Sequence, residues 1–435
     1  MMGPVVRRRK GGSRQKRSRR TSSARRTIVF AGGPTGEGEV SALKDPDDRL
    51  DFGLTEDQIA LRKLAHSLAK ELYEPHATEW DLAGVHLPES ERLRLAGLDL
   101  LGITLPTEYG GGGRPLLDAL IVIEEIAKAS QLAAFPIFEA STGPARVIDL
   151  FGTDDQKAQF LPPVARGEKT IAVAISEPDA GSAATDMKAH AEIKGNEIII
   201  NGAKRWCTGA GRAEQYLVYV TFEPKSGSAG IGAVLVDKDT KGLSFGPQER
   251  LMGFHGIPSA DMFFDRLRVP VERLIIPQGG FRKLFTAFSI ERLGNAAMSL
   301  AIGQSSLDRS ARYVQERKQF GRPVIDFQLV QSTVANMVMQ VDAARMLIYR
   351  AAINAGNNAP QTLEASIAKC FANEMAKQVS DMAIQLHGGY GYSVDYSVER
   401  LHRDSHGWAI AGGTTNMQRI RIASEFLGRR FEQRS

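Results

Sequence analysis

Four segments of the chain hold residue types that can bind a flat cofactor or move a proton. Residues 174–182 read Ala-Ile-Ser-Glu-Pro-Asp-Ala-Gly-Ser, and residues 204–208 read Lys-Arg-Trp-Cys-Thr. Gly and Pro in the first segment let the backbone approach an extended aromatic ligand, and its small hydroxyls offer hydrogen bonds without bulk. Alone, such a turn is more often a connector between strands, and a Trp is more often a core residue. The two segments together favour a ligand site.

The other two segments carry charge. Residues 316–323 read Glu-Arg-Lys-Gln-Phe-Gly-Arg-Pro, and the planar guanidinium of Arg317 matches the oxygens of a phosphate. The alternative is a solvated charge at a helix end, because the Gly and Pro of this segment stop a helix. Glu291, which precedes Arg292, can abstract a proton if burial raises its pKa toward neutrality. The alternative for Glu291 is an ordinary acid near a helix start, paired with Arg292.

In type and order these segments resemble the acyl-CoA dehydrogenase family, from about Phe52 to Leu427. Residues 176–182 are similar to the family turn that wraps the flavin, although Ala183 stands where the family usually has Asp. Residues 206–208 are similar to its Trp-Ile-Thr motif, whose Trp covers the isoalloxazine ring. The resemblance implies FAD as the cofactor.

Two further landmarks extend the resemblance. Residues 317–321 look like the family's Arg-x-x-Phe-Gly signature, whose Arg binds the pyrophosphate of an FAD held mainly by a neighbouring subunit. Residues 385–392 resemble a second loop that faces FAD. The resemblance implies that the following residues contact the cofactor: Val173, Ile175, Ser176, Gly181, Ser182, Trp206, Thr208, Arg317, Phe320, Phe327, Gln328, Gln385, Gly388, Gly389, Thr414 and Asn416. A site shared between chains implies a homotetramer or a homodimer.

The catalytic base is where the sequence departs from the family pattern. Residues 412–419 resemble the segment whose Glu abstracts the substrate α-proton, but Gly412 stands at that position. Some family members carry the base on an earlier helix, just before an Arg that lies 25 residues ahead of the FAD-binding Arg, and Glu291 has this spacing. The resemblance therefore implies Glu291 as the base and the Gly412 N–H as a donor to the thioester carbonyl. It implies contacts of the substrate with Ser182, Ser289, Arg292 and Gly413, although Ser289 replaces an Asp.

The expected activity is the oxidation of a saturated acyl-CoA to the trans-2-enoyl-CoA, with electrons passed to an electron-transferring flavoprotein. Gly412 leaves room beside the reacting carbons, which favours a branched or bulky acyl chain. Three departures from the family, Gly412, Ala183 and Ser289, keep two alternatives open. One is a flavin-binding protein without dehydrogenase turnover, whose basic arm binds nucleic acid. The other is a desaturase that acts on an acyl group carried by a carrier protein.

The composition is that of a globular enzyme. The chain has 435 residues, of which 43% are hydrophobic, and this excludes disorder as the dominant state. Its two cysteines form no disulfide framework or Cys-rich zinc site, and His402 and His406 have no evident third ligand, so we expect no metal. No apolar run approaches the roughly 18 residues needed to span a bilayer. We expect a cytoplasmic protein without a membrane span.

The positive net charge of +5 comes from one end of the chain. Residues 1–30 hold 11 Lys and Arg and no acid, so the rest is mildly acidic. We interpret residues 1–46 as a disordered basic arm. It has three possible roles: binding nucleic acid, acting as a presequence that directs the protein to the mitochondrial matrix, or none. The last is favoured, and nucleic acid is not an expected partner.

The elements that position these segments follow an order of helices, strands and helices. We expect an α+β multidomain fold with an N-terminal helical domain over 47–170, a central antiparallel β-barrel or sandwich over 171–278 and a C-terminal four-helix domain over 279–435. Helices are expected at 55–72, 89–97, 115–130, 143–151, 154–165, 281–316, 326–356, 361–386 and 415–428. Strands are expected at 170–175, 197–200, 216–220, 231–236, 262–264 and 267–270.

Overall fold

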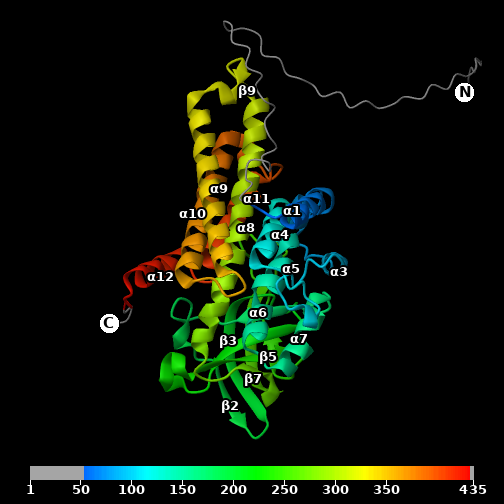
Figure 1. The fold of residues 1–435 in the computed structure, drawn as a ribbon, viewed down its shortest axis with the longest axis vertical. Coiled ribbons are helices and arrows are strands. Elements are labelled where there is room, and N and C mark those ends of the chain that lie inside the picture. The colour runs from blue at the N-terminus through cyan, green and yellow to red at the C-terminus, as the bar shows by residue number, and fades with distance from the viewer. Residues whose placement is uncertain (1–52, 432–435) are drawn as a thin grey trace, which may run out of the picture. The chain divides into compact units, whose positions relative to one another are not determined.

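The computed structural model describes residues 53–431, so the basic arm lies outside the described residues. The predicted order of helical, β-sheet and helical domains is confirmed (Figure 1). No helix among residues 53–431 is long and apolar enough to cross a membrane. The N-terminal helices are α1 (Glu56–Leu68), which continues as a π-helical turn (Ala69–Tyr73), α2 (Ala77–Ala83), α3 (Glu89–Gly97), α4 (Leu116–Ala129), α5 (Gln131–Thr142), α6 (Pro144–Phe151) and α7 (Asp154–Ala165).

Local sequence sets the starts of these helices. The hydroxyl of Thr55 accepts a hydrogen bond from the Gln58 N–H, and the Gln58 side chain accepts one from the Thr55 N–H, which forms the predicted capping box of α1. Helix α5 was not predicted. Ser130 both ends α4 and caps α5, with its Oγ accepting from the Ala133 N–H. Because α5 is apolar on nearly all sides, it lacks the periodicity that marks a separate helix.

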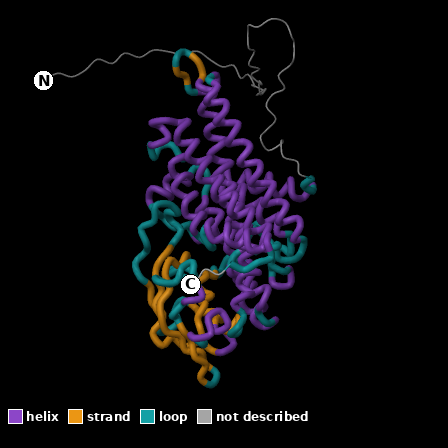
Figure 2. Tube along the Cα trace, turned by 90° about the vertical axis from the view of Figure 1, so that its left-hand side faces the viewer, coloured by secondary structure: helices purple, strands orange, loops and turns teal. Residues whose placement is uncertain are grey.

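The β domain is one eight-stranded sheet with the order β6-β7-β3-β2-β4-β5-β8, in which β1 also pairs with β4. Figure 2 shows its strands gathered at one end of the helices. Most neighbouring strands pair antiparallel, as predicted, but β1 runs parallel to β4, and β2 pairs parallel with β4 at one position. The β2–β3 hairpin lies between β1 and β4 in sequence, so the chain re-enters the sheet in its original direction. The strands are β1 (Ile171–Ala174), β2 (His190–Lys194), β3 (Glu197–Thr208), β4 (Gln215–Thr221), β5 (Ile231–Asp237), β6 (Leu243–Phe245), β7 (Ser259–Pro270) and β8 (Leu274–Ile276).

The C-terminal helices pack around α8, the longest helix of the described residues. Helix α8 contacts α4 and α5 of the N-terminal layer as well as α9, α10 and α11. The prediction of four helices missed α11, because Arg400 and Asp404 interrupt the apolar residues of its buried face. The elements are α8 (Phe281–Glu316), a short hairpin of β9 (Lys318–Gln319) and β10 (Arg322–Pro323), α9 (Gln328–Ala355), α10 (Thr362–His387), α11 (Val398–Ile410) and α12 (Thr415–Leu427).

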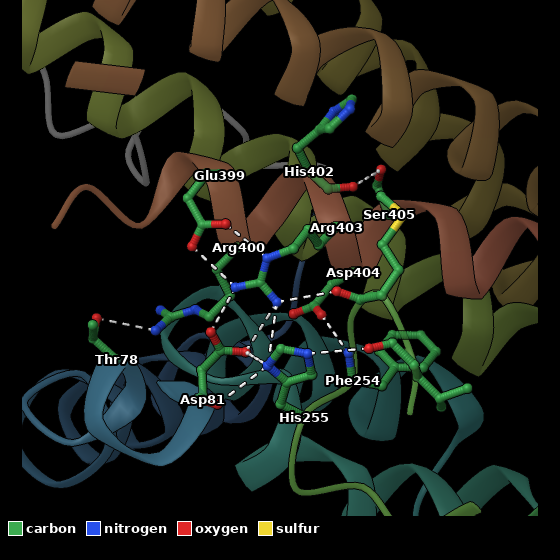
Figure 3. Close-up of polar contacts among 12 residues, drawn as sticks. Thr78, Asp81, Phe254, His255, Glu399, Arg400, His402, Arg403, Asp404 and Ser405 are labelled. Atoms are coloured by element: carbon green, nitrogen blue, oxygen red, sulfur yellow. Dashed lines mark hydrogen bonds and ion pairs between the residues drawn. The ribbon is translucent and has the colours of Figure 1, made fainter. Parts of the chain in front are cut away.

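A buried ionic cluster joins α11 to the other two domains (Figure 3). Arg403 donates to both carboxylate oxygens of Asp81 on α2, at 2.6 and 3.3 Å, and to Glu399 on its own helix at 2.7 and 3.0 Å. The carboxylate of Asp404 accepts the N–H of Phe254, from the loop before β7, at 2.7 Å. Phe254 packs edge-on against Trp408. The cluster therefore fixes α11, and the turn that follows it, against the rest of the chain.

Replacing Asp404 by Asn is expected to make stability less dependent on pH. Burial raises the pKa of Asp404 to about 6, so its contribution to stability is fully present below its unfolded pKa of about 3.9 and is lost as the pH rises through about 6. Asn cannot ionise, and its carbonyl still accepts the Phe254 N–H. The variant should avoid a loss of roughly 2–3 kcal/mol between about pH 4 and pH 7.

The measurement is the melting temperature of the wild type and the variant across this pH range. Asp239→Asn, which removes an exposed carboxylate of the β domain, is the control and should follow the wild type. Parallel pH curves for Asp404→Asn and the wild type would contradict the expected burial of this charge.

Candidate active site

Glu291 and Gly412 lie face to face, although they are far apart in the sequence. Glu291 is on α8, and Gly412 is in the turn between α11 and α12 with a φ of 64°. A Cβ atom placed on Gly412 would lie 2.7 Å from both carboxylate oxygens of Glu291. The carboxylate therefore occupies the space that a side chain at position 412 would need.

The surroundings of Glu291 make its carboxylate a stronger base. Its Oε2 atom is buried and has no hydrogen-bond partner among the described residues. Burial raises the pKa of Glu291, and the positive charges of Lys369 and Arg292 oppose this shift in part. A buried carboxylate without a hydrogen bond is costly for the fold, and such groups commonly mark sites of function.

Positively charged and amide side chains hold the turn that carries Gly412. Lys369 on α10 donates to the carbonyl oxygens of Ala411 and, at 2.8 Å, Gly413. Gln418 on α12 donates to the same Gly413 oxygen at 2.9 Å. The N–H groups of Gly412 and Gly413 donate to no other group in the described part of the chain. The turn thus presents free donors beside the Glu291 carboxylate.

Arg292 is buried beside this turn with unused donors. Only 4% of the residue is exposed, and its Nε and Nη1 atoms have no partner within residues 53–431. Burial lowers the pKa of Arg292 to about 10, which leaves it charged at neutral pH. Ser289, predicted to bind substrate, is buried with its hydroxyl donating to the Phe285 carbonyl of its own helix at 3.1 Å. The Ser289 proton is therefore used within its own helix.

The turn after β1 and the end of β3 are tied together by a buried ion pair that the sequence analysis missed. Lys204 is fully buried and donates to Glu177 at 2.8 Å and to the Ile175 carbonyl at 2.9 Å. Glu177 also accepts the N–H of Lys188 at 2.6 Å. A charged residue in each of two predicted segments was the only signal in the sequence. The ion pair brings the predicted cofactor residues of both segments to one edge of the sheet.

The predicted cofactor residues at this edge of the sheet differ in how far they are exposed. Gly181 and Ser182 are exposed, and the others are half-buried: Val173, Ile175, Ser176 and Thr208. The Arg205 N–H donates to the Ser176 carbonyl at 2.9 Å, which joins the two segments through their backbones.

Trp206 is held outward in a strained backbone conformation. Its φ is 59°, in the left-handed region that costs a non-glycine residue energy, and 53% of the residue is exposed. The guanidinium of Arg205 lies 4.3 Å from the centre of the indole ring, and Asp261 and Glu249 hold it there with contacts of 2.7 and 3.1 Å. An exposed, oriented indole is suited to stacking on a flat ring such as isoalloxazine.

A second group of predicted cofactor residues surrounds a hollow of about 660 Å³ at the far end of α8. Arg317, Gly388 and Gly389 line it, and Arg317 is exposed over the ring of Tyr390. Phe320 in the β9–β10 hairpin is 94% exposed with a φ of 52°, and its ring lies 6.0 Å from that of Phe327. Gln328 and Gln385 are also exposed.

The two groups of predicted cofactor residues are far apart within one chain. Arg317 follows Glu291 by 26 residues along α8, which corresponds to about 39 Å of helix. Figure 1 likewise shows the β9 hairpin and β3 at opposite ends of the described chain. Thr414 caps α12, and Asn416 lies in the first turn of that helix, so both follow Gly412 closely in the chain. One chain therefore does not bring all predicted cofactor residues together.

Comparison with known proteins gives matches over almost all described residues. Three family profiles match: acyl-CoA dehydrogenase, N-terminal domain, over residues 55–168; middle domain, over 172–267; and C-terminal domain, over 278–427. A 3-(aryl)acrylate reductase of Clostridium sporogenes is 37% identical over 374 residues, which are 86% of this chain and 99% of that protein. The probable acyl-CoA dehydrogenase YngJ of Bacillus subtilis is 37% identical over 87% of this chain and 100% of its own.

Two solved structures are similar throughout. Butyryl-CoA dehydrogenase from Megasphaera elsdenii has a TM-score of 0.84 and 33% identity, covering 87% of this chain and 100% of that chain. The prolyl acyl carrier protein oxidase AnaB has a TM-score of 0.81 and 26% identity, covering 86% and 100%.

Proposed function

The chain belongs to the acyl-CoA dehydrogenase family, and from this premise we propose that it oxidises the Cα–Cβ bond of an acyl-CoA thioester with Glu291 as the base. In the proposed reaction the α-hydrogen leaves as a proton to the Glu291 carboxylate and the β-hydrogen leaves with both bonding electrons. The product is the trans-2-enoyl-CoA. The observation that carries the proposal is that the Glu291 carboxylate fills the space beside Gly412.

The residues around Glu291 suit an enolate. Proton abstraction next to a thioester places negative charge on the carbonyl oxygen, and nearby donors lower the barrier by stabilising that charge. The free N–H of Gly412 and the buried cation of Arg292 provide such donors beside the base. Together they would favour charge development at the reacting end of the substrate, while Ser182 and Gly413 remain candidates for contacts with the pantetheine arm.

FAD fits the residues that would hold it. Trp206 offers an oriented aromatic face, and the small residues of the turn after β1 leave the backbone accessible. When bound, FAD supplies the acceptor for the β-hydrogen at its N5 atom. The chain would orient the ring with Trp206 and Thr208, and it would bind the pyrophosphate of a second copy's FAD with Arg317.

The separation along α8 supports an oligomer. The pyrophosphate of FAD lies only a ribityl chain from the flavin ring, whereas Arg317 lies about 39 Å along α8 from Glu291. We therefore propose that each FAD site is completed by the hairpin of a second chain, in a homodimer or homotetramer. An electron-transferring flavoprotein is the proposed electron acceptor.

A branched acyl chain is expected to be oxidised faster than a straight chain of the same length. The turn presents Ala411 and Gly412 to the site. The Glu291 carboxylate fills the space directly beside Gly412, but neither turn residue carries a side chain beyond a methyl group that would crowd the acyl chain. The measurement is kcat/KM for matched pairs of branched and straight acyl-CoA substrates, with an expected ratio of about 10 or more in favour of the branched chain. A clear preference for the straight chain would overturn this expectation.

Anaerobic mixing of the FAD-loaded protein with a set of acyl-CoA thioesters tests the proposed function. Loss of the flavin absorbance with at least one thioester is the expected result. If no thioester reduces the flavin, the protein is a flavin-binding member of the family without this activity.

A carrier-protein substrate is the second candidate. One similar structure is named as a prolyl acyl carrier protein oxidase. The same phosphopantetheine arm reaches the site in both cases. Faster flavin reduction by an acyl group on a carrier protein than by the same group on coenzyme A would favour this candidate.

A further inference from the structure

Lys369 is a fully buried cation next to the turn that carries Gly412. It lies on α10, and its ammonium group donates to the carbonyl oxygens of Ala411 and Gly413. These two carbonyls flank Gly412, whose Cβ position meets the Glu291 carboxylate. Lys369 therefore holds the Ala411–Gly413 turn in place next to Glu291.

The charges around Lys369 come from two helices. Glu291 and Arg292 face it from α8, and Cys370 follows it on α10. Arg421 on α12 interacts with Arg292, and the turn itself contributes only carbonyl oxygens. Among the described residues Glu291 is thus the acidic group that acts on Lys369. Lys369 and Arg292 are the cations that act on Glu291.

A chain of buried amides fixes the distance between α10 and α8 at this level. Asn373, one helical turn after Lys369, donates to Asn295 at 2.9 Å and to Ser299 at 2.6 Å. Asn295 lies one turn after Glu291 and donates to the Trp408 carbonyl at 3.4 Å. With the Asn373 amide in its other orientation, it donates instead to the carbonyls of Lys369 and Trp408. In either orientation the helix that carries Lys369 is locked to the helix that carries Glu291.

We propose that Lys369 is a positioning residue of the reaction: it anchors the Ala411–Gly413 turn against Glu291, and its buried positive charge favours the ionised form of the Glu291 carboxylate. The proposal rests on the proposed role of Glu291 as the base. It assigns to one buried side chain both the geometry of the turn and the charge state of the group that accepts the proton.

Electrostatics supports the second role. Burial raises the pKa of Glu291, and the nearby positive charge of Lys369 is the first of the two influences that lower it. Removal of that charge leaves a larger fraction of Glu291 protonated at neutral pH. Burial lowers the pKa of Lys369 itself to about 8, so its charge is lost in mildly alkaline solution. Flavin reduction should therefore rise with pH as Glu291 ionises and fall again near pH 8.

Two substitutions separate the two roles. Lys369→Met removes the charge and both hydrogen bonds, and Lys369→Gln removes the charge but keeps an amide donor for one carbonyl. The measurement is the rate of flavin reduction by saturating acyl-CoA as a function of pH. In both variants the acidic limb should move to higher pH, and the alkaline limb near pH 8 should disappear. The limiting rate should fall by about 10- to 100-fold in Lys369→Met and less in Lys369→Gln.

Substrate affinity and a matched control distinguish positioning from general damage. Because Lys369 is fully buried behind the turn that it holds, the dissociation constant for acyl-CoA should change much less than the reduction rate. Lys128→Met removes another mostly buried lysine, which pairs with Glu125 on α4 and is none of the predicted cofactor or substrate residues, and should leave the acidic limb where it is in the wild type. An unchanged acidic limb in both Lys369 variants, or a loss that appears wholly in substrate affinity, would overturn the proposal.

The wild type provides a test that does not depend on the folding of a variant. An amine ionises with a large enthalpy and a carboxylic acid with almost none. The alkaline limb should therefore move to lower pH as the temperature rises, and a limb that stays in place would contradict the assignment to Lys369. If no acyl-CoA reduces the wild-type flavin, the proposed function fails first. If the wild type is reduced but neither limb behaves as described, only the role of Lys369 fails.

Discussion

Replacing Glu291 by Gln is expected to abolish the reduction of bound flavin by acyl-CoA while FAD stays bound. Gln has the same shape but accepts no proton at neutral pH, so the α-hydrogen has no acceptor. A positioned general base contributes about 10²–10⁴-fold to a rate, and we expect a loss of this size in the reduction step. The fold should tolerate the change, because it removes a buried charge that lacks a hydrogen bond.

The measurement is anaerobic stopped-flow reduction, with FAD content determined on the same samples. Glu71→Gln, at an exposed glutamate of the N-terminal helices, serves as the control and should reduce at the wild-type rate. Reduction of the Glu291→Gln variant at close to the wild-type rate would remove Glu291 from the mechanism.

Gly412→Glu is expected to lose activity as a single substitution and to regain part of it when it is combined with Glu291→Gly. In Gly412→Glu the new Cβ would lie 2.7 Å from both oxygens of Glu291, and a φ of 64° costs a side chain roughly 1 kcal/mol more. The single variant should lose activity and stability. Glu291→Gly clears that space, so the double variant should place a carboxylate near the same substrate atom from the opposite side.

The double variant should therefore reduce its flavin at least about 10-fold faster than either single variant, a barrier lower by about 1.4 kcal/mol. The coupling energy exceeds this difference by the loss that the other single variant suffers. Gly412→Ala combined with Glu291→Gly is the matched control, since it has the same backbone strain and no carboxylate. The control should fold and bind FAD but leave it oxidised in the presence of acyl-CoA. Strictly additive losses in the double variant would mean that the two positions do not share one space.

Parts of this fold follow from local sequence and parts do not. Helix α3 begins and ends at the predicted residues, because it follows Pro88 and carries acids in its first turn and Arg94 in its last. Helix α5 is apolar on nearly every side and so lacks a distinct apolar stripe. In α11 the buried Arg400 and Asp404 interrupt the apolar stripe. The runs 262–264 and 267–270 were predicted separately, but they form the single strand β7, which continues through Arg266 at a φ of 46°.

The site residues also divide into those that the sequence predicts and those that only the packed structure reveals. The spacing of Glu291 from Arg317 and the loss of a side chain at position 412 can be seen in the sequence through the resemblance to the family. The meeting of Glu291 with Gly412 requires α8, α11 and α12 to pack together, and no local pattern contains that contact. Lys369 could not be found in the sequence, because a buried lysine on a helix has the same local signature as a solvated one. Its two carbonyl partners lie on a different element.

The most direct test of Glu291 separates proton abstraction from flavin reduction. An acyl-CoA with sulfur in place of its β-carbon has no β-hydrogen to give up, so only its α-hydrogens can react. In D₂O the wild type should exchange these hydrogens for deuterium, as detected by mass spectrometry. The Glu291→Gln variant should bind the analogue without exchanging them. Exchange by the variant at the wild-type rate would show that another group removes the proton and would contradict the central claim.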